Sequence, residues 1–357
     1  MKLKILFLDD SNTELDKYKY LFDRNSFAKE HFDFYTLQIN SLDLSHIKLD
    51  FRPDLILIDF RFDLPGGEET FYDGYSLSTS LRNLYNDIPL IIFTRKDIFN
   101  IQRFPKNIIE IVDDIFYKTD FNQRENDYYI AIHSLATGYK SLIGIEDKNW
   151  DSLLTVLNSP KEDEINLLGS KKPIMNQGKW SVIDSANWIR KILLRFPGIL
   201  YDELHASTFL GISVKAFKEL QERFNDATYT GIFQTNNKYY WKSILRNISI
   251  DLMNSQTINL PINIGFPQAY EKSSGRKVEP SRCVYSSEPN AERVCYVLKM
   301  PVKTKYSFTY NIDDRPDVMD PARVSWKAIQ TTDEVIEDYL NPLAKEMLTT
   351  IKAKKEK

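Results

Sequence analysis

Short apolar runs alternate with longer segments of mixed polarity in the first third of the chain. The runs cover residues 4–8, 54–58, 89–93 and 114–117, and each has the length of a strand that is buried on both faces of a parallel sheet. Apolar positions then recur at helical spacing between residues 122 and 142. The pattern predicts an α/β, doubly wound parallel sheet for an N-terminal domain over residues 1–142.

Residues 143–180 interrupt this pattern with Gly and Pro, and we interpret them as a connector. Residues 181–255 then predict three helices followed by a hairpin, which is the order of elements in a winged helix-turn-helix. The helices are expected at 185–196, 201–210 and 214–224, and the strands at 228–234 and 239–242. We therefore expect an α+β, winged-helix-like module after the parallel sheet.

Residues 256–357 carry no motif, and we expect an α+β region of unknown role. Residues 263–281 are rich in Gly, Pro and charge and predict a loop. The expected elements are strands at 293–300, 307–310 and 324–328 and a helix at 332–351.

Scattered charges in this last region have two interpretations each. Its acids are more consistent with turns than with a second metal site: Asp313, Asp314, Asp317 and Asp320. Its basic residues could bind a phosphate-bearing ligand or an acidic partner, although the sequence does not concentrate them: Lys303, Lys305, Arg315, Arg323 and Lys327.

A polar residue directly follows each of the four predicted strands of the parallel sheet. Asp9 and Asp10 follow the first strand, and Asp59, Thr94 and Lys118 follow the others. Because the carboxyl ends of parallel strands meet at one edge, these side chains are expected together. Crowded carboxylates suit Mg²⁺, and an aspartate can attack phosphorus to give an acyl phosphate. A hydroxyl and an ammonium would neutralise the transferred oxygens, so the set predicts a phosphorylation site.

With these five residues in this order, residues 1 to about 140 resemble a response-regulator receiver domain, whose fold is flavodoxin-like. The resemblance implies that Asp9, Asp10 and Asp59 bind Mg²⁺ and that Asp59 is the phosphoacceptor. It implies that Thr94 is the switch hydroxyl and that Lys118 pairs with the phosphate. It also implies a histidine kinase or a phosphotransfer protein as partner.

Several features depart from the receiver pattern, and two of them bear on access to the predicted phosphorylation site. The loop after Asp59 is several residues longer than in receivers and carries Glu68 and Glu69. Arg95 stands where a small residue is common, and its long side chain could obstruct the phosphodonor or mimic a phosphate contact. These departures keep open the alternative of a non-phosphorylated pseudo-receiver that serves as a scaffold for protein interaction.

The winged-helix interpretation gives candidate nucleic-acid residues on the third helix and on the loop between the strands. Glu219 and Glu222 on that helix argue against DNA, because phosphate contacts favour a surface with little acid. The winged-helix-like module could therefore bind a protein or form a homodimer as well as bind DNA. The candidate residues are Lys215, Lys218, Arg223 and Lys238.

Composition limits the remaining classes. With 47 Lys and Arg against 50 Asp and Glu, the net charge of -3 neither favours nor excludes a polyanionic partner. No apolar run approaches the roughly 18 residues of a membrane span, so we expect a cytoplasmic protein without membrane association. Cys283 and Cys295 are expected to be buried thiols. The alternative is a cysteine-dependent enzyme in which His205 activates one of them.

Together these patterns predict a phosphorylation-dependent response regulator of two-component signal transduction. Phosphoryl acceptance on Asp59 would control a C-terminal output that binds DNA or protein. The protein is expected to catalyse at most its own phosphorylation and dephosphorylation.

Overall fold

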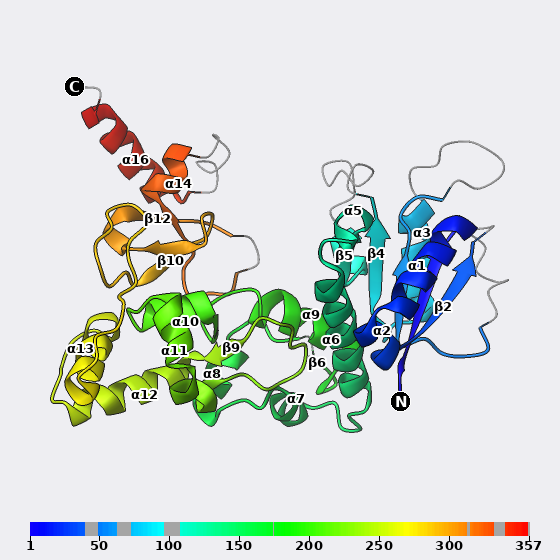
Figure 1. Ribbon diagram of the computed structural model, residues 1–357, viewed down its shortest axis with the longest axis horizontal. Helices are drawn as coiled ribbons and strands as arrows, with labels where there is room; N and C mark the ends of the chain where they lie inside the picture. The colour runs from blue at the N-terminus through cyan, green and yellow to red at the C-terminus, as the bar shows by residue number, and fades with distance from the viewer. Residues whose placement is uncertain are drawn as a thin grey trace. The chain divides into compact units, whose positions relative to one another are not determined.

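The computed structural model describes residues 1–39, 49–62, 73–95, 108–173, 175–312, 315–331 and 340–355. The chain forms two compact units (Figure 1). Unit 1 comprises Met1–Val156, Pro173–Asn187 and Ile232–Asn236, and unit 2 comprises Leu157–Lys172, Trp188–Gly231 and Asn237–Lys357. The domain boundaries that the sequence suggests at residues 142, 180 and 255 stay predictions.

Unit 1 is built on a five-stranded sheet whose strand order is β2-β1-β3-β4-β5. All four neighbouring pairs of strands are parallel. The strands are β1 (Leu3–Asp9), β2 (Phe32–Gln38), β3 (Leu55–Ile58), β4 (Leu90–Thr94) and β5 (Asp114–Tyr117). This order is that of the flavodoxin-like doubly wound fold, with its switch point between β1 and β3, and it confirms the predicted fold class.

Helices cover both faces of the sheet. They are α1 (Asn12–Arg24), α2 (Ser26–His31), α3 (Asp73–Leu84), α4 (Ile108–Ile111), α5 (Lys118–Phe121) and α6 (Glu125–Ile143). Because successive strand residues point to opposite faces, Leu6 and Leu8 pack in one cluster with Leu77 of α3. Phe7 points the other way and meets Tyr18 of α1 edge to face, with ring centroids 5.6 Å apart. Burial of each such side chain contributes about 1.5 to 3 kcal/mol to folding.

The middle region has a winged-helix-like order of elements, but the predicted hairpin is wrong. Its strand β9 (Tyr239–Trp241) pairs antiparallel with β8 (Leu200–Asp202), where the sequence suggested the start of a helix. The segment expected as the other strand reaches β9 only through an isolated bridge between Thr228 and Tyr240. A short apolar run such as 199–201 fits a strand or a helix equally well, and only its pairing partner decides.

The helices of the middle region are divided between the units, with residues up to Asn187 in unit 1 and residues from Trp188 to Gly231 and from Asn237 onward in unit 2. The expected helix at 185–196 is α9 (Val182–Trp188) continued by a π-helical turn, η4 (Ile189–Leu193). The expected helix at 214–224 is α11 (Val214–Glu219) followed by a 3-10 helix, η5 (Gln221–Ala227). The remaining helices here are α10 (Glu203–Phe209), α12 (Lys242–Ser255) and α13 (Ile262–Ser274).

Helix α13 corrects the prediction of a loop at 263–281. Phe266, Ala269 and Tyr270 are buried at helical spacing, and Phe266 packs in the same cluster as Phe217 and Phe224. Burial of this face stabilises the helix although Pro267 lies inside it and removes a backbone donor.

The C-terminal sheet has the strand order β11-β10-β13-β12. Its strands are β10 (Arg293–Cys295), β11 (Met300–Val302), β12 (Ser307–Thr309) and β13 (Arg323–Ser325). The strand predicted at 293–300 is therefore two strands with a turn between them. The strand predicted at 324–328 ends at Ser325, because its hydroxyl accepts the Ala328 N–H and caps α14 (Trp326–Thr331).

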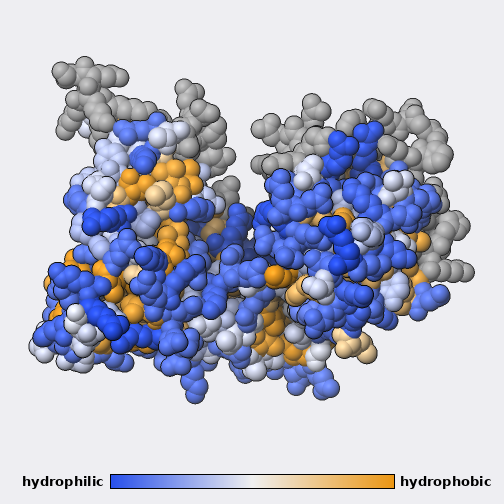
Figure 2. All heavy atoms as spheres, viewed as in Figure 1, coloured by the Kyte–Doolittle hydropathy of each residue, from blue (hydrophilic) through white to orange (hydrophobic). Residues whose placement is uncertain are grey.

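Several smaller elements complete the described chain. They are α7 (Trp150–Leu157), η3 (Lys161–Asp163), α8 (Glu164–Leu168), β6 (Met175–Asn176), β7 (Lys179–Trp180), η6 (Thr304–Tyr306) and α16 (Pro342–Lys355). The first part of the helix predicted at 332–351 lies outside the described residues. No helix in the described part of the chain has the length and apolarity to cross a membrane. Hydrophilic side chains cover most of the surface in view, with apolar ones in smaller patches (Figure 2).

Candidate functional site

The sheet register brings the ends of β1 and β3 together. Leu8 lies opposite Ile58, so the next residues of the two strands, Asp9 and Asp59, are neighbours at the carboxyl edge. Two backbone hydrogen bonds of 2.9 Å hold this edge: Asp59 N–H donates to the Leu8 carbonyl, and Ile39 N–H donates to the Asp9 carbonyl. Asp9 is 1% exposed and Asp59 is 8% exposed. Both carboxylates are therefore placed by the sheet itself.

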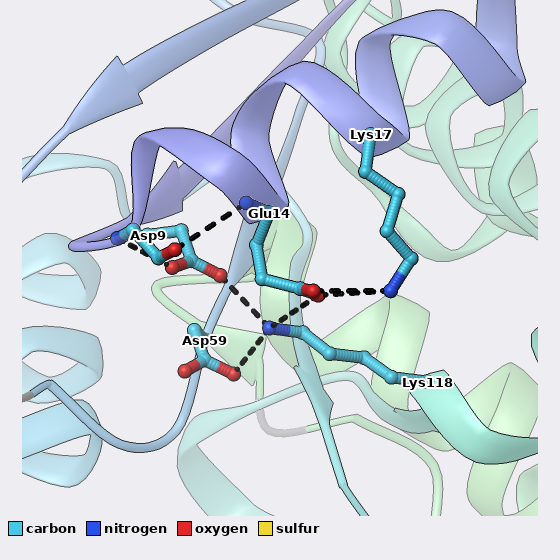
Figure 3. Close-up of polar contacts among 6 residues, drawn as sticks. Asp9, Glu14, Lys17, Asp59 and Lys118 are labelled. Carbon is cyan, nitrogen blue, oxygen red and sulfur yellow. Dashed lines mark hydrogen bonds and ion pairs between the residues drawn. The ribbon is translucent and has the colours of Figure 1, made fainter.

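Lys118 joins the two buried carboxylates. It begins α5 directly after β5, and its Nζ lies 2.8 Å from Asp9 Oδ2 and 2.9 Å from Asp59 Oδ1 (Figure 3). Its side chain is only 8% exposed. An ammonium shared by two buried carboxylates is strongly attracted to both, because little water screens the charges.

A further acid, Glu14, reaches the same ammonium from α1. Its Oε2 lies 3.8 Å from Lys118 Nζ, and its Oε1 lies 3.0 Å from Lys17 Nζ (Figure 3). Ser11 caps α1 by accepting the Glu14 N–H. Sequence reasoning missed Glu14, although the spacing Ser11-x-x-Glu14 is that of a capping box, which places a Glu in the first turn of a helix.

Burial and crowding shift the protonation of this cluster. Burial is the main reason that the pKa of Asp59 is raised from 3.8 to about 6; Asp9 raises it further, and Lys118 opposes the shift. Burial also raises the pKa of Asp9, again against the effect of Lys118. Burial alone would lower the pKa of Lys118, but Asp59 and Asp9 raise it above its ordinary value. The ammonium therefore stays charged at neutral pH, while Asp59 lies close to titration.

The raised pKa of Asp59 predicts how stability changes with pH. Since the folded protein binds the Asp59 proton more tightly than the unfolded chain, stability falls as pH rises from about 4 to about 6. The loss at neutral pH is on the order of 2 to 3 kcal/mol. Urea unfolding of metal-free protein should therefore show that the free energy of unfolding of Asp59→Asn, relative to that of the wild type, is larger at pH 7.5 than at pH 4.5. An equal difference between the two proteins at both pH values would contradict this prediction.

The three acids can supply a metal site. One carboxylate oxygen from each of Asp9, Asp10 and Asp59 can be chosen so that all three lie within 4.8 Å of one another. Hard carboxylate oxygens are the ligands that Mg²⁺ prefers. The donor set therefore fits the ion that the receiver resemblance implies.

An open cavity of about 580 Å³ lies over these groups. Besides the acids and Lys118, the exposed Arg61 and Arg95 line it. Sequence reasoning anticipated Arg95 at this place and missed Arg61. The loop acids Glu68 and Glu69 lie outside the described residues. Two guanidinium groups at the mouth would attract an anionic donor, although they also narrow its approach.

Thr94 ends β4 at the same edge of the sheet. It is fully buried, and in the described structure its Oγ1 has no hydrogen-bond partner. A buried hydroxyl without a partner is costly, so such a group is commonly kept for a ligand or for a second state of the protein.

Gly74 of α3 packs directly on the segment after Asp59, where a Cβ would lie 2.4 Å from the Phe60 carbonyl oxygen.

The candidate nucleic-acid residues are all exposed in unit 2. Lys215 and Lys218 lie on α11, and Lys218 pairs with Glu203 at 3.2 Å. Arg223 lies in η5 over the ring of Tyr270, with its guanidinium carbon 5.1 Å from the centroid. Lys238 precedes β9. Their role in binding DNA stays a prediction.

The two cysteines are free and buried, at 2% for Cys283 and 0% for Cys295. Burial raises the pKa of Cys283, but hydrogen bonds to its sulfur from Ser286 and from backbone N–H groups outweigh it and hold the pKa below its ordinary value. His205 Nδ1 lies 2.8 Å from Asp202 Oδ1. Within the described residues no histidine contacts a thiol, so the geometry gives no support to a Cys-His nucleophile.

Comparison with known proteins identifies the class of the neighbours. No protein-family model matches the sequence, and neither does any curated protein. Receiver domains and response regulators are among the solved structures similar to this chain. A receiver domain from Clostridium thermocellum is 18% identical, with 39% of this chain and 97% of that chain covered and a TM-score of 0.28. The HemR receiver domain from Leptospira biflexa is 16% identical, with coverages of 36% and 94% and a TM-score of 0.26.

RcsB from Salmonella typhimurium is 12% identical, with coverages of 54% and 91% and a TM-score of 0.28. With identities and scores this low, the fold assignment rests on the order and register of the strands in unit 1.

Proposed function

We propose that this protein is a phosphorylation-dependent response regulator whose phosphoacceptor is Asp59. The observation that carries the proposal is Lys118 Nζ, which lies within 2.9 Å of both Asp9 and Asp59 at the carboxyl edge of a flavodoxin-like sheet. The third acid, Asp10, completes a carboxylate set suited to Mg²⁺. Thr94 supports the proposal because its buried hydroxyl has no hydrogen-bond partner among the described residues.

These residues have distinct parts in the proposed reaction. A carboxylate oxygen of Asp59 attacks phosphorus, the bond from phosphorus to the donor's leaving atom breaks, and the leaving group departs with its electron pair. Asp9, Asp10 and Asp59 would hold Mg²⁺, which supplies positive charge for the phosphoryl oxygens when bound. The Lys118 ammonium then pairs with the phosphoryl oxygens in place of the carboxylate, and the Thr94 hydroxyl donates a hydrogen bond to one of these oxygens.

The partner in this proposal is a histidine kinase or a phosphotransfer protein, and the output lies in the C-terminal part. Phosphorylation adds about -1.5 to -2 charges, enough to reorder the groups around Lys118. Residues 181–357 would pass this change to a protein or to DNA. The exposed lysines of α11 support either kind of partner.

Incubation of the metal-loaded protein with a small acyl phosphate tests the proposal. With Mg²⁺, intact mass spectrometry should show a gain of one phosphoryl group, and a chelator should abolish the gain because the crowded acids then lack their cation. Binding of Mg²⁺ should also raise the unfolding temperature, through its preference for the folded state. A phosphoryl gain that persists in chelator would overturn the assigned metal role.

A folded protein that takes up no phosphoryl group under these conditions would favour the scaffold. Arg61 and Arg95 at the cavity mouth give that alternative a physical basis, since their side chains could occupy the place of the donor. The same experiment therefore separates the two functions.

A further inference from the structure

A second cavity, of about 160 Å³, lies wholly within unit 2. Its walls come from β8 and α10 and from the C-terminal strands β10 and β13. An engineered protein cavity of about 150 Å³ can hold a benzene molecule. This cavity therefore has room for a group of the size of a single ring.

Among the described residues, cationic side chains outnumber acids around this cavity. Three described carboxylates line it: Asp202, Glu292 and Asp320. Five cationic side chains line it: Arg195, Arg293, Lys299, Arg315 and Arg323. The fold thus brings Arg315 and Arg323, which the sequence leaves scattered, together with three more cations from distant parts of the chain.

The acids of the wall are already engaged. Asp320 accepts from Lys242 Nζ at 2.7 Å and from the Tyr201 hydroxyl, so only a longer contact of 3.8 Å is left for Arg293 Nη1. Asp202 faces the ring of His205 at 2.8 Å, and Glu292 accepts the Thr304 N–H at 2.8 Å. Among the described residues, the 3.8 Å contact of Asp320 with Arg293 is the one ion pair that these carboxylates make with an arginine of the cavity.

Among the described residues, most of these cations have no carboxylate within ion-pair distance. Arg323 donates to Ser307, Thr309 and the Thr304 carbonyl, and Arg315 donates to the backbone carbonyls of Pro316 and Met319. These acceptors are neutral. In the described part of the chain, Arg195 and Lys299 have no carboxylate within ion-pair distance.

The lowered pKa of Arg323 also indicates an excess of positive charge at the cavity. Burial lowers the pKa of Arg323, and the neighbouring Arg293 lowers it further, with only Glu292 opposing. Two guanidinium groups that repel each other in a partly buried site are stabilised by an anion placed between or beside them.

A buried hydroxyl and aromatic side chains complete the site. Thr208 of α10 lines the cavity at 1% exposure, and its Oγ1 has no hydrogen-bond partner among the described residues. Tyr201, Tyr239 and Tyr296 line the same cavity. A buried polar atom without a partner calls for a ligand or a water, and aromatic walls favour a ligand with a planar or apolar body.

We propose that this cavity binds a small organic anion, a single ring or a body of similar size that carries a phosphate or a carboxylate. Its anionic oxygens pair with Arg293 and Arg323, Thr208 Oγ1 donates a hydrogen bond, and the ring packs against the tyrosines. The site is independent of Asp59 and of the proposed phosphorylation. It gives the C-terminal region, whose role the sequence leaves open, a ligand-binding function.

Isothermal titration calorimetry on the full-length protein tests this site with four probes: phenyl phosphate, benzoate, inorganic phosphate and benzylamine. Either ring-bearing anion should bind with one-to-one stoichiometry, and benzylamine, a ring of opposite charge, should not bind. Tighter binding of phenyl phosphate identifies a phosphate ligand, and tighter binding of benzoate identifies a carboxylate ligand. Inorganic phosphate should bind at least tenfold more weakly than the better ring-bearing anion.

Variants locate the binding in this cavity. Arg293→Met should weaken binding at least tenfold, and Thr208→Val, which keeps the shape of the side chain, should weaken it severalfold without loss of folding. The matched control is Lys277→Met, because Lys277 is 85% exposed and is not among the residues of the cavity wall. If Arg293→Met does not fold, Lys299→Met provides the same test from an exposed position.

Three results would overturn the proposal. They are the absence of binding by both ring-bearing anions up to about 10 mM, equal binding of benzylamine, and anion binding that neither cavity variant weakens. Asp59→Asn should bind the probes as the wild type does, so failure of the anion site and failure of the phosphoacceptor are distinguishable.

Discussion

Replacement of Asp59 by asparagine is expected to abolish phosphoryl uptake from an acyl phosphate. The amide has the size of the carboxylate but is a poor nucleophile at phosphorus, and it removes one of the three carboxylates of the proposed Mg²⁺ site. The variant should nevertheless fold. The raised pKa of Asp59, about 6, means that the fold already tolerates a neutral side chain at this position.

Intact mass spectrometry after incubation with Mg²⁺ and the acyl phosphate measures this loss directly. The matched control is Asp16→Asn, because Asp16 is an exposed acid of α1 that is not among the residues lining the cavity over Asp59. The control should take up one phosphoryl group as the wild type does. Full uptake by Asp59→Asn would place the phosphoacceptor elsewhere and refute the assignment.

Replacement of Lys118 by methionine should produce the largest loss of stability of any change at this site. The substitution leaves Asp9 and Asp59 buried without the ammonium that lies within 2.9 Å of both. Removal of one partner of a buried ion pair costs about 3 to 5 kcal/mol. The loss should be greater at pH 7.5 than at pH 5, because protonation of Asp59 at the lower pH relieves the uncompensated charge.

Urea unfolding monitored by far-ultraviolet circular dichroism would report this loss. Lys140→Met is the matched control, since Lys140 makes a 3.5 Å ion pair with Asp54 from a side chain that is 51% exposed. An exposed pair contributes about 0 to 1 kcal/mol, so this control should unfold almost as the wild type does. Equal effects of the two substitutions would show that Lys118 is not the electrostatic centre of the site.

Four of the five strands of the parallel sheet, and the edge at which they end, could be predicted from sequence because local information specifies both. The edge strand β2 was not predicted, because its partly exposed residues form no apolar run. Buried strands appear as apolar runs, and the residue after each run must lie at the carboxyl edge wherever strands are parallel. Asp9, Asp59 and Lys118 are in contact for this reason. The residues that reach the site from elsewhere, Glu14 and Arg61, depend on helix and loop geometry and were not foreseen.

The middle and C-terminal elements were harder to predict because competing structures have similar local preferences. Residues 200–202 form β8 only because Tyr239–Trp241 lies beside them, and α13 forms around Pro267 because Phe266 joins a buried cluster. Such tertiary contacts outweigh local propensity, which amounts to about 1 kcal/mol per residue or less for most residue types.

The sequence by itself determined the class of the sheet and the identity of the acids, the threonine and the lysine at its edge. Only the tertiary structure decided that Lys118 lies between two buried carboxylates and that burial raises the pKa of Asp59. It also decided that the hydroxyl of Thr94 is buried with no hydrogen-bond partner among the described residues. It also decided that scattered arginines meet around one cavity. Charge, burial and hydrogen bonding depend on distances through space, which the order of residues along the chain does not contain.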